Sequence, residues 1–503
     1  MNLATQSSRR NQWSVVAGVV PFLVLAARHW QYGPLAAFGD WAQYMSHADA
    51  LWHGRPYGDI GYIFTSQNPF IGPPIQPPGL PAALVPVLAL TGGARDAAAY
   101  KAFMVVWALA FLGLVMMYFS RGGDRALGVV TAAVVGLWLE ASFATNVVQP
   151  DIPCCAFLWG AFYLADTRGA WTWPRVAGIT LLGFSAVAFR LAALPLLPAL
   201  FLYALIHRRE QRVRLWIPVG TWVVCGIVAA LAVPDALTFA RLLRLDLSEL
   251  TGHVIEAAKL YPLGVFEIFL YPFPWDRAND AYHLVAIGAT GVGLVAWVRR
   301  ATTKLLTLFT VMYVCMLAVL PMQDGRYLMP IAPLIVYALA CGAVIVIRWL
   351  ARRLRRDVSE AHARLATVMV VAGVLALTLG RELTRPGPTV LLDVPGVPQL
   401  FERVRTMNAA TPARVAFVNP RVLTWRTGVP AMGFFKATPD STLLELRNKQ
   451  ITHVILGDLD TDSIHVESMR SAVEARPDAF RRLYAEGPFT VYAFDAARAG
   501  AAP

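Results

Sequence analysis

Long apolar segments, repeated along the first 380 residues and separated by short basic clusters, constrain this chain more than any other feature. A membrane-spanning helix needs about 20 mostly apolar residues, because each residue adds about 1.5 Å and the hydrocarbon core is about 30 Å thick. Eleven segments come close to this length: 13–31, 98–119, 126–146, 152–167, 176–190, 191–206, 215–233, 281–298, 305–321, 328–348 and 363–380. We therefore predict a mainly α-helical, polytopic membrane protein with about eleven spans.

The composition agrees with a membrane protein and argues against a nucleic-acid partner. Hydrophobic residues make up 57% of the 503 residues and charged residues only 15%, whereas soluble proteins carry about a quarter. The net charge is +12, but the basic residues lie in short clusters between apolar segments, as they do in cytoplasmic loops. Three of the five cysteines lie inside apolar runs, so no disulfide framework is predicted. Membrane lipids are the partners that this composition favours.

The basic clusters also predict the sidedness of the spans. If the first span is a retained signal anchor with a cytoplasmic N-terminus, every even-numbered connection is basic, as the positive-inside rule requires. These clusters are Arg121 and Arg125, Arg168 and Arg175, Arg208 to Arg214, Arg299 to Lys304, and Arg348 to Arg356. The connections 32–97, 147–151, 234–280 and 323–327 and the C-terminal tail then lie outside.

The apolar piece 80–90 is too short for a span. Counting it as one would reverse the sidedness of every later basic cluster. We therefore interpret it as an interfacial or re-entrant segment at the outer surface.

Near residue 381 the composition changes, and polar residues begin to mix with short apolar runs. Helical patterns at "VPQLFERVRTMN", "DSTLLELRNKQ" and "MRSAVEARPDAFRRLYAEG" alternate with strand-like "ARVAFVN", "THVILGD" and "FTVYAFD". We predict two domains: a transmembrane domain over 1–380, which includes the first outer loop 32–97, and a small α/β domain over 381–503.

The first outer loop, "FGDWAQYMSHADALWHGRPYGDIGY", is rich in acidic, histidine and aromatic residues. If residues 39–53 form a helix, Asp40, Tyr44, His47 and Leu51 share one face. One interpretation is that Asp40 only caps an amphipathic helix on the membrane surface. The interface anchors of that helix are then Trp41, Tyr44 and Trp52. The other interpretation is that Asp40 acts on a substrate; the loop histidines have no second matching pair, so a metal site is disfavoured.

A second acidic residue, Asp151 in "NVVQPDIPCC", opens a predicted span on the same side as Asp40. It is either an N-cap or the partner of Asp40 in an acid–base site. Arg190 and Arg326 are expected at the outer ends of spans, where a charged residue is costly and usually has a functional partner. Snorkelling to the headgroups is the alternative for both arginines. Arginine suits bidentate capture of phosphate, and lipids are the abundant phosphates here.

Several motifs, taken in order, carry a family resemblance. "GDWAQYMSHADALWHGRPYGDI" has an acidic residue, a Tyr, an Ala and then G-x-P-Y-x-D, and "PPIQPPGLPAAL" closes the same loop. Together with "QPDIP" and "GRYLMPIAPLIVYAL", the stretch from residue 1 to about 350 resembles the polytopic GT-C glycosyltransferases. The similar groups are the protein O-mannosyltransferases, the aminoarabinose transferase acting on lipid A and the galacturonic acid transferases of lipopolysaccharide.

The resemblance implies a glycosyltransferase that takes a sugar from a polyprenyl-phosphate carrier and passes it, with inversion, to a lipid, glycan or protein acceptor. It implies that Asp40 is the general base, that Asp151 is a second acidic residue of the catalytic site, and that Arg190 and Arg326 hold the lipid phosphate. It extends substrate binding to other positions within these motifs, which are Tyr44, His47, Tyr57, Asp59, Gln76 and Tyr327. No cofactor is implied, although a divalent cation stays open.

The resemblance also implies a location, the bacterial inner membrane, with the active site and the C-terminal domain on the periplasmic face. Two positions depart from the aminoarabinose-transferase pattern: Trp41 follows the acidic residue where a Glu is expected, and Gln76 replaces a frequent Lys. The lipid A enzyme in particular is therefore not indicated.

Two other functions stay open. A flippase or transporter of lipid-linked sugars is expected to show paired repeats or ionisable residues near the midplane, and the sequence shows neither. A non-catalytic envelope assembly protein would bind through its C-terminal domain, for which acceptor recognition is our own expectation. In that domain Asp458, Asp460 and Asp462 lack the glycine and glutamate of a calcium loop and are interpreted as a solvated turn.

Overall fold

The structure is a computed structural model, and its contacts divide the chain into two units. One, the helical unit, comprises Met1–Gln31, Lys101–Thr145 and Pro150–Pro386; the other, the mixed unit, comprises Tyr32–Tyr100, Asn146–Gln149 and Gly387–Pro503. The described residues are 3–31, 39–65, 76–92, 97–121, 124–142, 144–167, 169, 171–206, 214, 216–224, 250–301, 304–320, 324–387, 394–457 and 463–500. The contacts thus group the first outer loop with the C-terminal residues, whereas the sequence-based division placed it with the spans.

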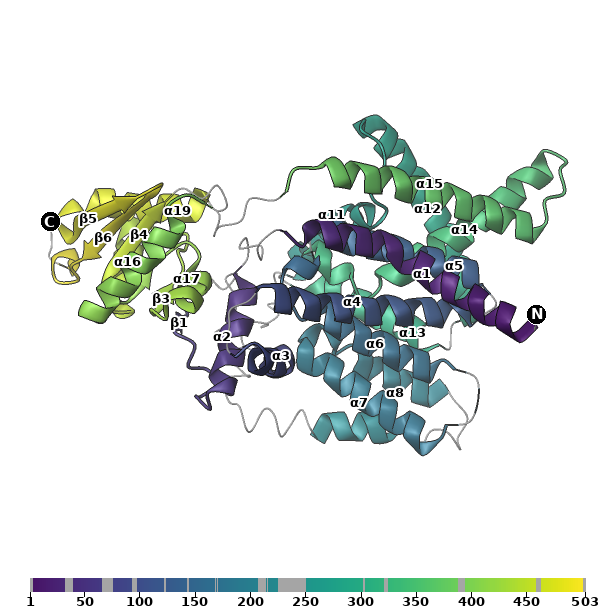
Figure 1. Cartoon of the computed structure of the whole chain (residues 1–503), viewed down its shortest axis with the longest axis horizontal. Helices are drawn as coiled ribbons and strands as arrows, with labels where there is room; N and C mark the ends of the chain where they lie inside the picture. Colours follow the sequence, from purple (N-terminus) through teal and green to yellow (C-terminus); the bar gives the residue numbers. More distant parts are fainter. Residues whose placement is uncertain are drawn as a thin grey trace. The chain divides into compact units, whose positions relative to one another are not determined.

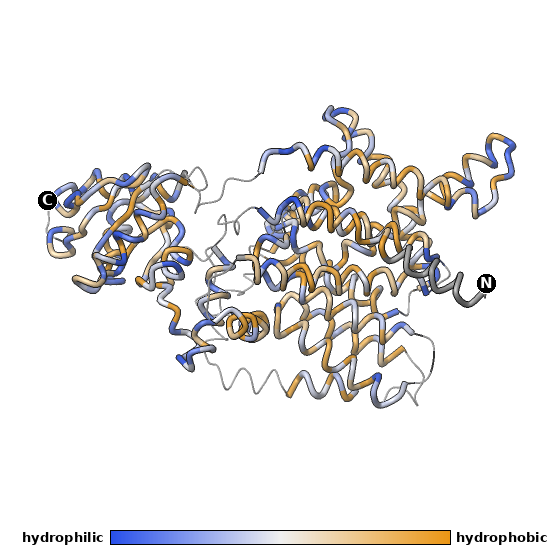
Figure 2. The backbone as a smooth tube through the Cα atoms, viewed as in Figure 1, coloured by the Kyte–Doolittle hydropathy of each residue, from blue (hydrophilic) through white to orange (hydrophobic). Residues whose placement is uncertain are grey.

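The helical unit is built from apolar helices, which Figure 2 shows as mostly orange tubes. Figure 1 labels these helices. Their bounds are α1 Leu3–His29, α4 Ala97–Ser120, α5 Arg125–Ala141, α6 Asp151–Ala165, α7 Trp173–Phe189, α8 Leu196–Ile206, α11 Leu250–Ile268, α12 Asp276–Ala301, α13 Leu305–Val319, α14 Ala332–Arg353 and α15 Glu360–Thr384. Four of them, α4, α12, α14 and α15, are long and apolar enough to cross a membrane. The chain is therefore an integral membrane protein, and the count of eleven spans stays a prediction.

The ends of these helices follow local chemistry. Helix α15 begins after Ser359, whose hydroxyl accepts a hydrogen bond from the His362 amide, and Glu360 lies in its first turn. Helices α12 and α14 pack closely because each has a glycine against the backbone of the other: Gly293 of α12 lies against Ala338, and Gly342 of α14 lies against Ala289. A Cβ on Gly293 would lie 1.8 Å from the Ala338 carbonyl oxygen. Small residues allow such backbone contact between membrane helices.

The mixed unit contains a six-stranded sheet in the order β1-β3-β2-β4-β6-β5. Its strands are β1 Tyr62–Ile63, β2 Val415–Ala416, β3 Ala431–Met432, β4 His453–Gly457, β5 Phe480–Glu486 and β6 Phe489–Phe494. Strands β1, β3, β2 and β4 pair in parallel with one another. Strand β6 pairs antiparallel with both β4 and β5. The helices of this unit are α2 Asp40–Trp52, α3 Gly79–Leu90, α16 Val397–Ala410, α17 Pro420–Thr427, α18 Pro439–Asn448 and α19 Ser463–Ala475. The expected small α/β fold is present, and its edge strand β1 comes from the first outer loop.

One expected helix was partly wrong. The pattern from Met469 to Gly487 predicted a single helix, but α19 ends at Ala475 and β5 follows. Proline restricts the preceding residue and disfavours a continuing helix, and Pro477 stands at this point. The residues that follow pair with β6, a contact that a local pattern does not reveal.

The short apolar piece 80–90 forms helix α3, of 12 residues, which packs against α2. Its relation to the membrane surface stays a prediction. Of the segment 215–233, residues 216–224 are helical and the remainder lies outside the described residues. The acidic stretch Asp458 to Asp462 also lies outside them.

Candidate active site

Asp40 is the first residue of α2, and the local backbone fixes its position. The preceding Gly39 has a φ of 61°, a conformation that side chains rarely adopt. A Cβ there would lie 2.6 Å from Oδ1 of Asn419, the residue before α17. Glycine therefore lets the start of α2 approach the start of α17 directly.

The Asp40 carboxylate forms an ion pair with Nη1 of Arg421, on α17. The Arg421 side chain is 2% exposed and that of Asp40 is 28% exposed. The guanidinium also lies 5.1 Å from the centre of the Tyr62 ring, in β1. Its Nε and Nη2 have no hydrogen-bond partner in the part of the chain that the structure describes. A buried guanidinium is costly unless it is paired, so this carboxylate is an important counter-charge.

The loop is packed into the mixed unit through its aromatic residues. Trp41 is buried and meets Trp425 of α17 edge to face, with ring centres 4.9 Å apart. Tyr44 is buried as well, and only Trp52 is exposed. The expectation that Trp41 and Tyr44 anchor a surface helix is therefore wrong: α2 buries most of its residues against α3 and α17.

Four residues expected to bind substrate form one hydrogen-bonded cluster. The Tyr57 hydroxyl donates to the Gln76 carbonyl oxygen at 2.8 Å, and the Tyr44 hydroxyl donates to Gln76 Oε1 at 3.3 Å. His47 stacks on the Tyr57 ring at 4.3 Å. The Gln76 side-chain amide in turn donates to Gln43 at 3.4 Å. These contacts tie the two ends of the outer loop together.

His47 is held in its neutral form within this cluster. Its Nδ1–H donates to the Tyr57 carbonyl oxygen at 2.8 Å, and its Nε2 accepts from the Gln76 amide at 3.4 Å. The pKa of His47 is lowered to about 4: burial is the largest cause, the hydrogen bond to Tyr57 opposes it, and the nearby Arg421 charge adds a smaller decrease. His47 therefore has a structural role in this cluster and does not exchange a proton at neutral pH.

Asp59 lies apart from this cluster. Its side chain is 62% exposed and lies 4.0 Å from Nη1 of Arg55, which also pairs with Asp49 at 2.6 Å. Exposed pairs of this kind contribute little to stability. The structure thus places Asp59 on the surface of the mixed unit.

The second expected carboxylate, Asp151, belongs to the helical unit. It begins α6, and its Oδ2 accepts from Nη1 of Arg190 at 2.5 Å. Arg190 follows the last residue of α7 in an extended conformation, which directs the chain out of that helix. Here the carboxylate is the buried partner, 5% exposed, and the guanidinium is 17% exposed.

Arg190 is also close to the short helix η4, Gly325–Leu328, which carries Arg326 and Tyr327. The Arg190 guanidinium carbon lies 5.0 Å from the centre of the Tyr327 ring, and that of Arg326 lies 5.7 Å from it. Arg326 in turn pairs with Asp324 at 2.8 Å. Two guanidinium groups therefore flank one aromatic ring, each next to a carboxylate.

The expected residues thus form two sites, each within its own unit. The helical unit brings together Asp151, Arg190, Arg326 and Tyr327, and the mixed unit contains Asp40 and the Tyr57 cluster. The sequence reasoning missed Arg421. A signal was available in "NPRVLTW", where one arginine stands among apolar residues, because a charge on an apolar helix usually has a buried partner. Among the described residues, no group of three or more His, Cys, Asp or Glu side chains could hold a metal ion.

Comparisons with known proteins address the fold. No protein-family model and no curated protein sequence matches the chain. Apo ArnT from Cupriavidus metallidurans aligns with a TM-score of 0.49 and 14% identity, covering 96% of this chain and 99% of that one.

The oligosaccharyltransferase of Archaeoglobus fulgidus, in complex with Zn and sulfate, aligns with a TM-score of 0.56 and 10% identity, covering 96% of this chain and 72% of that one. The same enzyme with an inhibitory peptide and a dolichol-phosphate gives a TM-score of 0.53 and 10% identity, covering 97% and 74%. At these identities the likeness is one of fold. It agrees with the motif resemblance from the sequence, and the chain has the fold of the GT-C glycosyltransferases.

Proposed function

We propose that this protein is a membrane glycosyltransferase that moves a sugar from a polyprenyl-phosphate carrier to an acceptor hydroxyl on a lipid, glycan or protein, with inversion. The GT-C fold supports the reaction class. A fold neighbour has been solved with a dolichol-phosphate, which supports a lipid-phosphate donor. The proposed active site faces the extracytoplasmic side of a bacterial inner membrane, following the charge-based topology.

The observation that carries the proposal is the Asp40–Arg421 ion pair. The buried guanidinium orients a carboxylate that remains partly exposed. In the proposed reaction Asp40 accepts the proton of the acceptor hydroxyl as its oxygen bonds to the anomeric carbon. The bond between that carbon and the phosphate oxygen breaks, its electron pair leaves with polyprenyl phosphate, and attack from the opposite face inverts the centre.

The leaving phosphate needs positive charge more than it needs an acid. We propose that Arg190 and Arg326 supply that charge, because arginine binds phosphate oxygens with two parallel hydrogen bonds. Asp151 is then a positioning residue, because it holds the Arg190 guanidinium at 2.5 Å. Tyr327, between the two arginines, limits the directions in which they can point.

The test is release of free polyprenyl phosphate by the purified full-length protein from a labelled polyprenyl-phosphate sugar. Loss of a general base typically costs about 10²- to 10⁴-fold, so Asp40→Asn is expected to lose turnover by that factor. Asp59→Asn, an exposed carboxylate of the same loop, is the matched control and should keep it. Steady transfer by folded Asp40→Asn protein, or labelled lipid that only changes leaflet, contradicts the proposal.

A further inference from the structure

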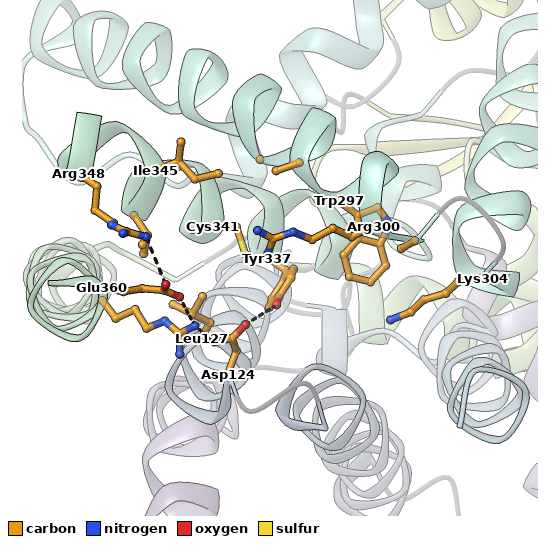
Figure 3. A pocket seen from close by; sticks show the side chains of 15 residues that line it. Asp124, Leu127, Trp297, Arg300, Lys304, Tyr337, Cys341, Ile345, Arg348 and Glu360 are labelled. Atoms are coloured by element: carbon orange, nitrogen blue, oxygen red, sulfur yellow. Dashed lines mark hydrogen bonds and ion pairs between the residues drawn. The ribbon is translucent and has the colours of Figure 1, made fainter. Parts of the chain in front are cut away.

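A cavity of about 260 Å³ lies in the helical unit where α12 and α14 meet the beginnings of α5 and α15. Figure 3 shows the side chains that line it, among them Arg300 and Tyr337. The charged lining residues come from the connections near 121–125, 299–304 and 348–364, which the charge pattern places in the cytoplasm. The cavity is therefore separate from the proposed transfer site on the outer side.

The charges of this cavity do not balance. Its lining contains four basic side chains and two carboxylates. Arg364 Nη2 contacts Asp124 Oδ1 and Glu360 Oε1 at 2.5 Å each, and Arg348 Nη1 contacts Glu360 at 3.2 Å. Both carboxylates are thus engaged by two of the arginines.

The other two cations of the lining are Arg300 and Lys304. Lys304 lies 4.8 Å from the centre of the Trp297 ring. Arg300 makes no hydrogen bond or ion pair with any residue that the structure describes, and no dashed line reaches it in Figure 3. The lining therefore has two more basic than acidic side chains, and the Arg300 guanidinium is available to an anion.

A second cavity, of about 440 Å³, adjoins the first. The two share Glu360 and Arg364, and the rest of the second lining is apolar: Ala126, Ala361, Leu365 and Val368. A cationic cavity that continues into an apolar groove matches a ligand with a charged head and a hydrocarbon chain. The groove lies on α15, a helix long and apolar enough to span the membrane.

We propose that these two cavities bind an anionic phospholipid of the cytoplasmic leaflet. Arg300 holds its phosphate, the positive charge of Lys304 adds to the attraction, and one acyl chain lies along Leu365 and Val368. Basic cavities between membrane helices on the cytoplasmic side are suited to anionic headgroups, and arginine matches phosphate geometry. The surrounding bilayer is the source of the ligand, because a groove on a membrane-spanning helix is filled by lipid.

The experiment measures lipid retained by the full-length protein in native mass spectra, from micelles containing equal amounts of phosphatidylglycerol and phosphatidylcholine. The protein is expected to retain phosphatidylglycerol. One basic residue near a membrane surface is worth about 1 kcal/mol, or about fivefold, so Arg300→Gln should lower retention by about fivefold. Arg299→Gln removes the neighbouring charge, which does not line the cavity, and should change it much less. Equal losses in the two variants would overturn the proposal.

A second pair of variants, one of them a control, tests the apolar groove. Leu365→Asn, in the groove, should lower retention, and Met369→Asn, also exposed on α15 but outside the groove, should not. Thermal unfolding confirms that each variant is folded, and Arg300→Lys keeps the charge if Arg300→Gln does not fold. Preferential retention of undecaprenyl phosphate in a parallel sample would overturn the phospholipid assignment. If inorganic phosphate alone displaced the lipid completely, the acyl chain would contribute nothing to binding, and its assignment to the groove would be overturned.

Discussion

The two carboxylate–arginine pairs use the same chemistry in opposite ways. In the mixed unit Arg421 is the buried partner and Asp40 is the more exposed one, at 2% and 28%. In the helical unit Asp151 is buried and Arg190 is the more exposed, at 5% and 17%. The exposed member is the one that a substrate can reach. The first site therefore offers a carboxylate, which suits a base, and the second offers a guanidinium, which suits a phosphate.

The largest expected effect comes from breaking the pair in the mixed unit. Removing one partner of a buried pair typically costs about 3 to 5 kcal/mol, because a charge is left uncompensated. Asp40→Asn should therefore lower the free energy of unfolding by that order, and adding Arg421→Gln should restore much of it. Denaturant unfolding of the full-length protein in detergent, arranged as a double-mutant cycle, gives the coupling between the two residues. Simple addition of the two single effects would show that the pair is not coupled.

Activity distinguishes this pair from a purely structural one. The double variant should regain stability without regaining transfer, because it has no base. Arg421→Gln alone keeps the carboxylate, so it should lower kcat more than it raises KM for the donor. Arg470→Gln removes an exposed pair with Glu467 in the same unit and serves as the control. An unchanged kcat in the single variant Arg421→Gln would contradict the proposal that Arg421 positions Asp40.

A pH effect of nearly the same size should mark the mixed unit. The pKa of His47 is about 4 in the fold and has an ordinary value of 6.5. The unfolded chain therefore binds a proton that the folded chain refuses, so this contribution to stability is complete above pH 6.5 and is lost as the pH falls towards 4. The shift corresponds to about 3 kcal/mol at most.

The measurement compares unfolding free energies at pH 7.5 and pH 5 in the wild type and in His47→Gln. The variant should show a smaller difference between the two pH values. The same slope in both proteins would assign the acid sensitivity to other groups.

A smaller effect, on the donor alone, should follow from changing the exposed member of the second pair. Arg190→Lys keeps a charge next to buried Asp151 but loses the planar fork. Charged hydrogen bonds contribute about 1.5 to 3 kcal/mol, so kcat/KM for the lipid-phosphate donor should fall by about tenfold to a hundredfold. Kinetics with varied donor and saturating acceptor test this. A defect seen only with varied acceptor would place Arg190 elsewhere in the reaction.

The smallest effect is expected from a change in the backbone next to Asp40, which affects the position of that residue but not its charge. Gly39→Ala introduces a Cβ at positive φ, which costs about 1 to 2 kcal/mol, and this Cβ meets the Asn419 side chain. Gly54→Ala provides a control, because Gly54 also has positive φ but has nothing within 4 Å. Gly39→Ala should lower activity more than Gly54→Ala at equal folded fraction. Equal activity would show that the approach of α2 to α17 is not needed for transfer.

Local sequence patterns predicted much of the fold, because the formation of these helices depends on residues that are close together in the sequence. The apolar segments around 98–119 and 328–348 correspond to α4 and α14, since length and hydrophobicity alone make a helix stable in hydrocarbon. The helices after Gly396 and after Thr438 were predicted from the helical spacing of their apolar residues, which is also a local property. The failures lie where a segment takes its structure from a distant partner: β5 pairs with β6, and β1 pairs with a strand more than 360 residues away.

The same distinction applies to the candidate sites. The sequence singled out Asp40, Asp151, Arg190 and Arg326 as candidates, because each was expected near the end of a helix or span, and their roles stay predictions. It did not identify Arg421, which lies 381 positions from Asp40. The alternative interpretation of the loop, as an amphipathic surface helix, assigned Trp41 and Tyr44 to a membrane interface, although both are buried.

The sequence by itself determined that this chain is a helical membrane protein with polar chemistry at the ends of its helices, because those properties depend on residues close together along the chain. Only the tertiary structure decided which charge each carboxylate meets and which partner of each pair stays exposed. Those outcomes depend on burial, and burial arises when segments far apart in sequence pack against each other.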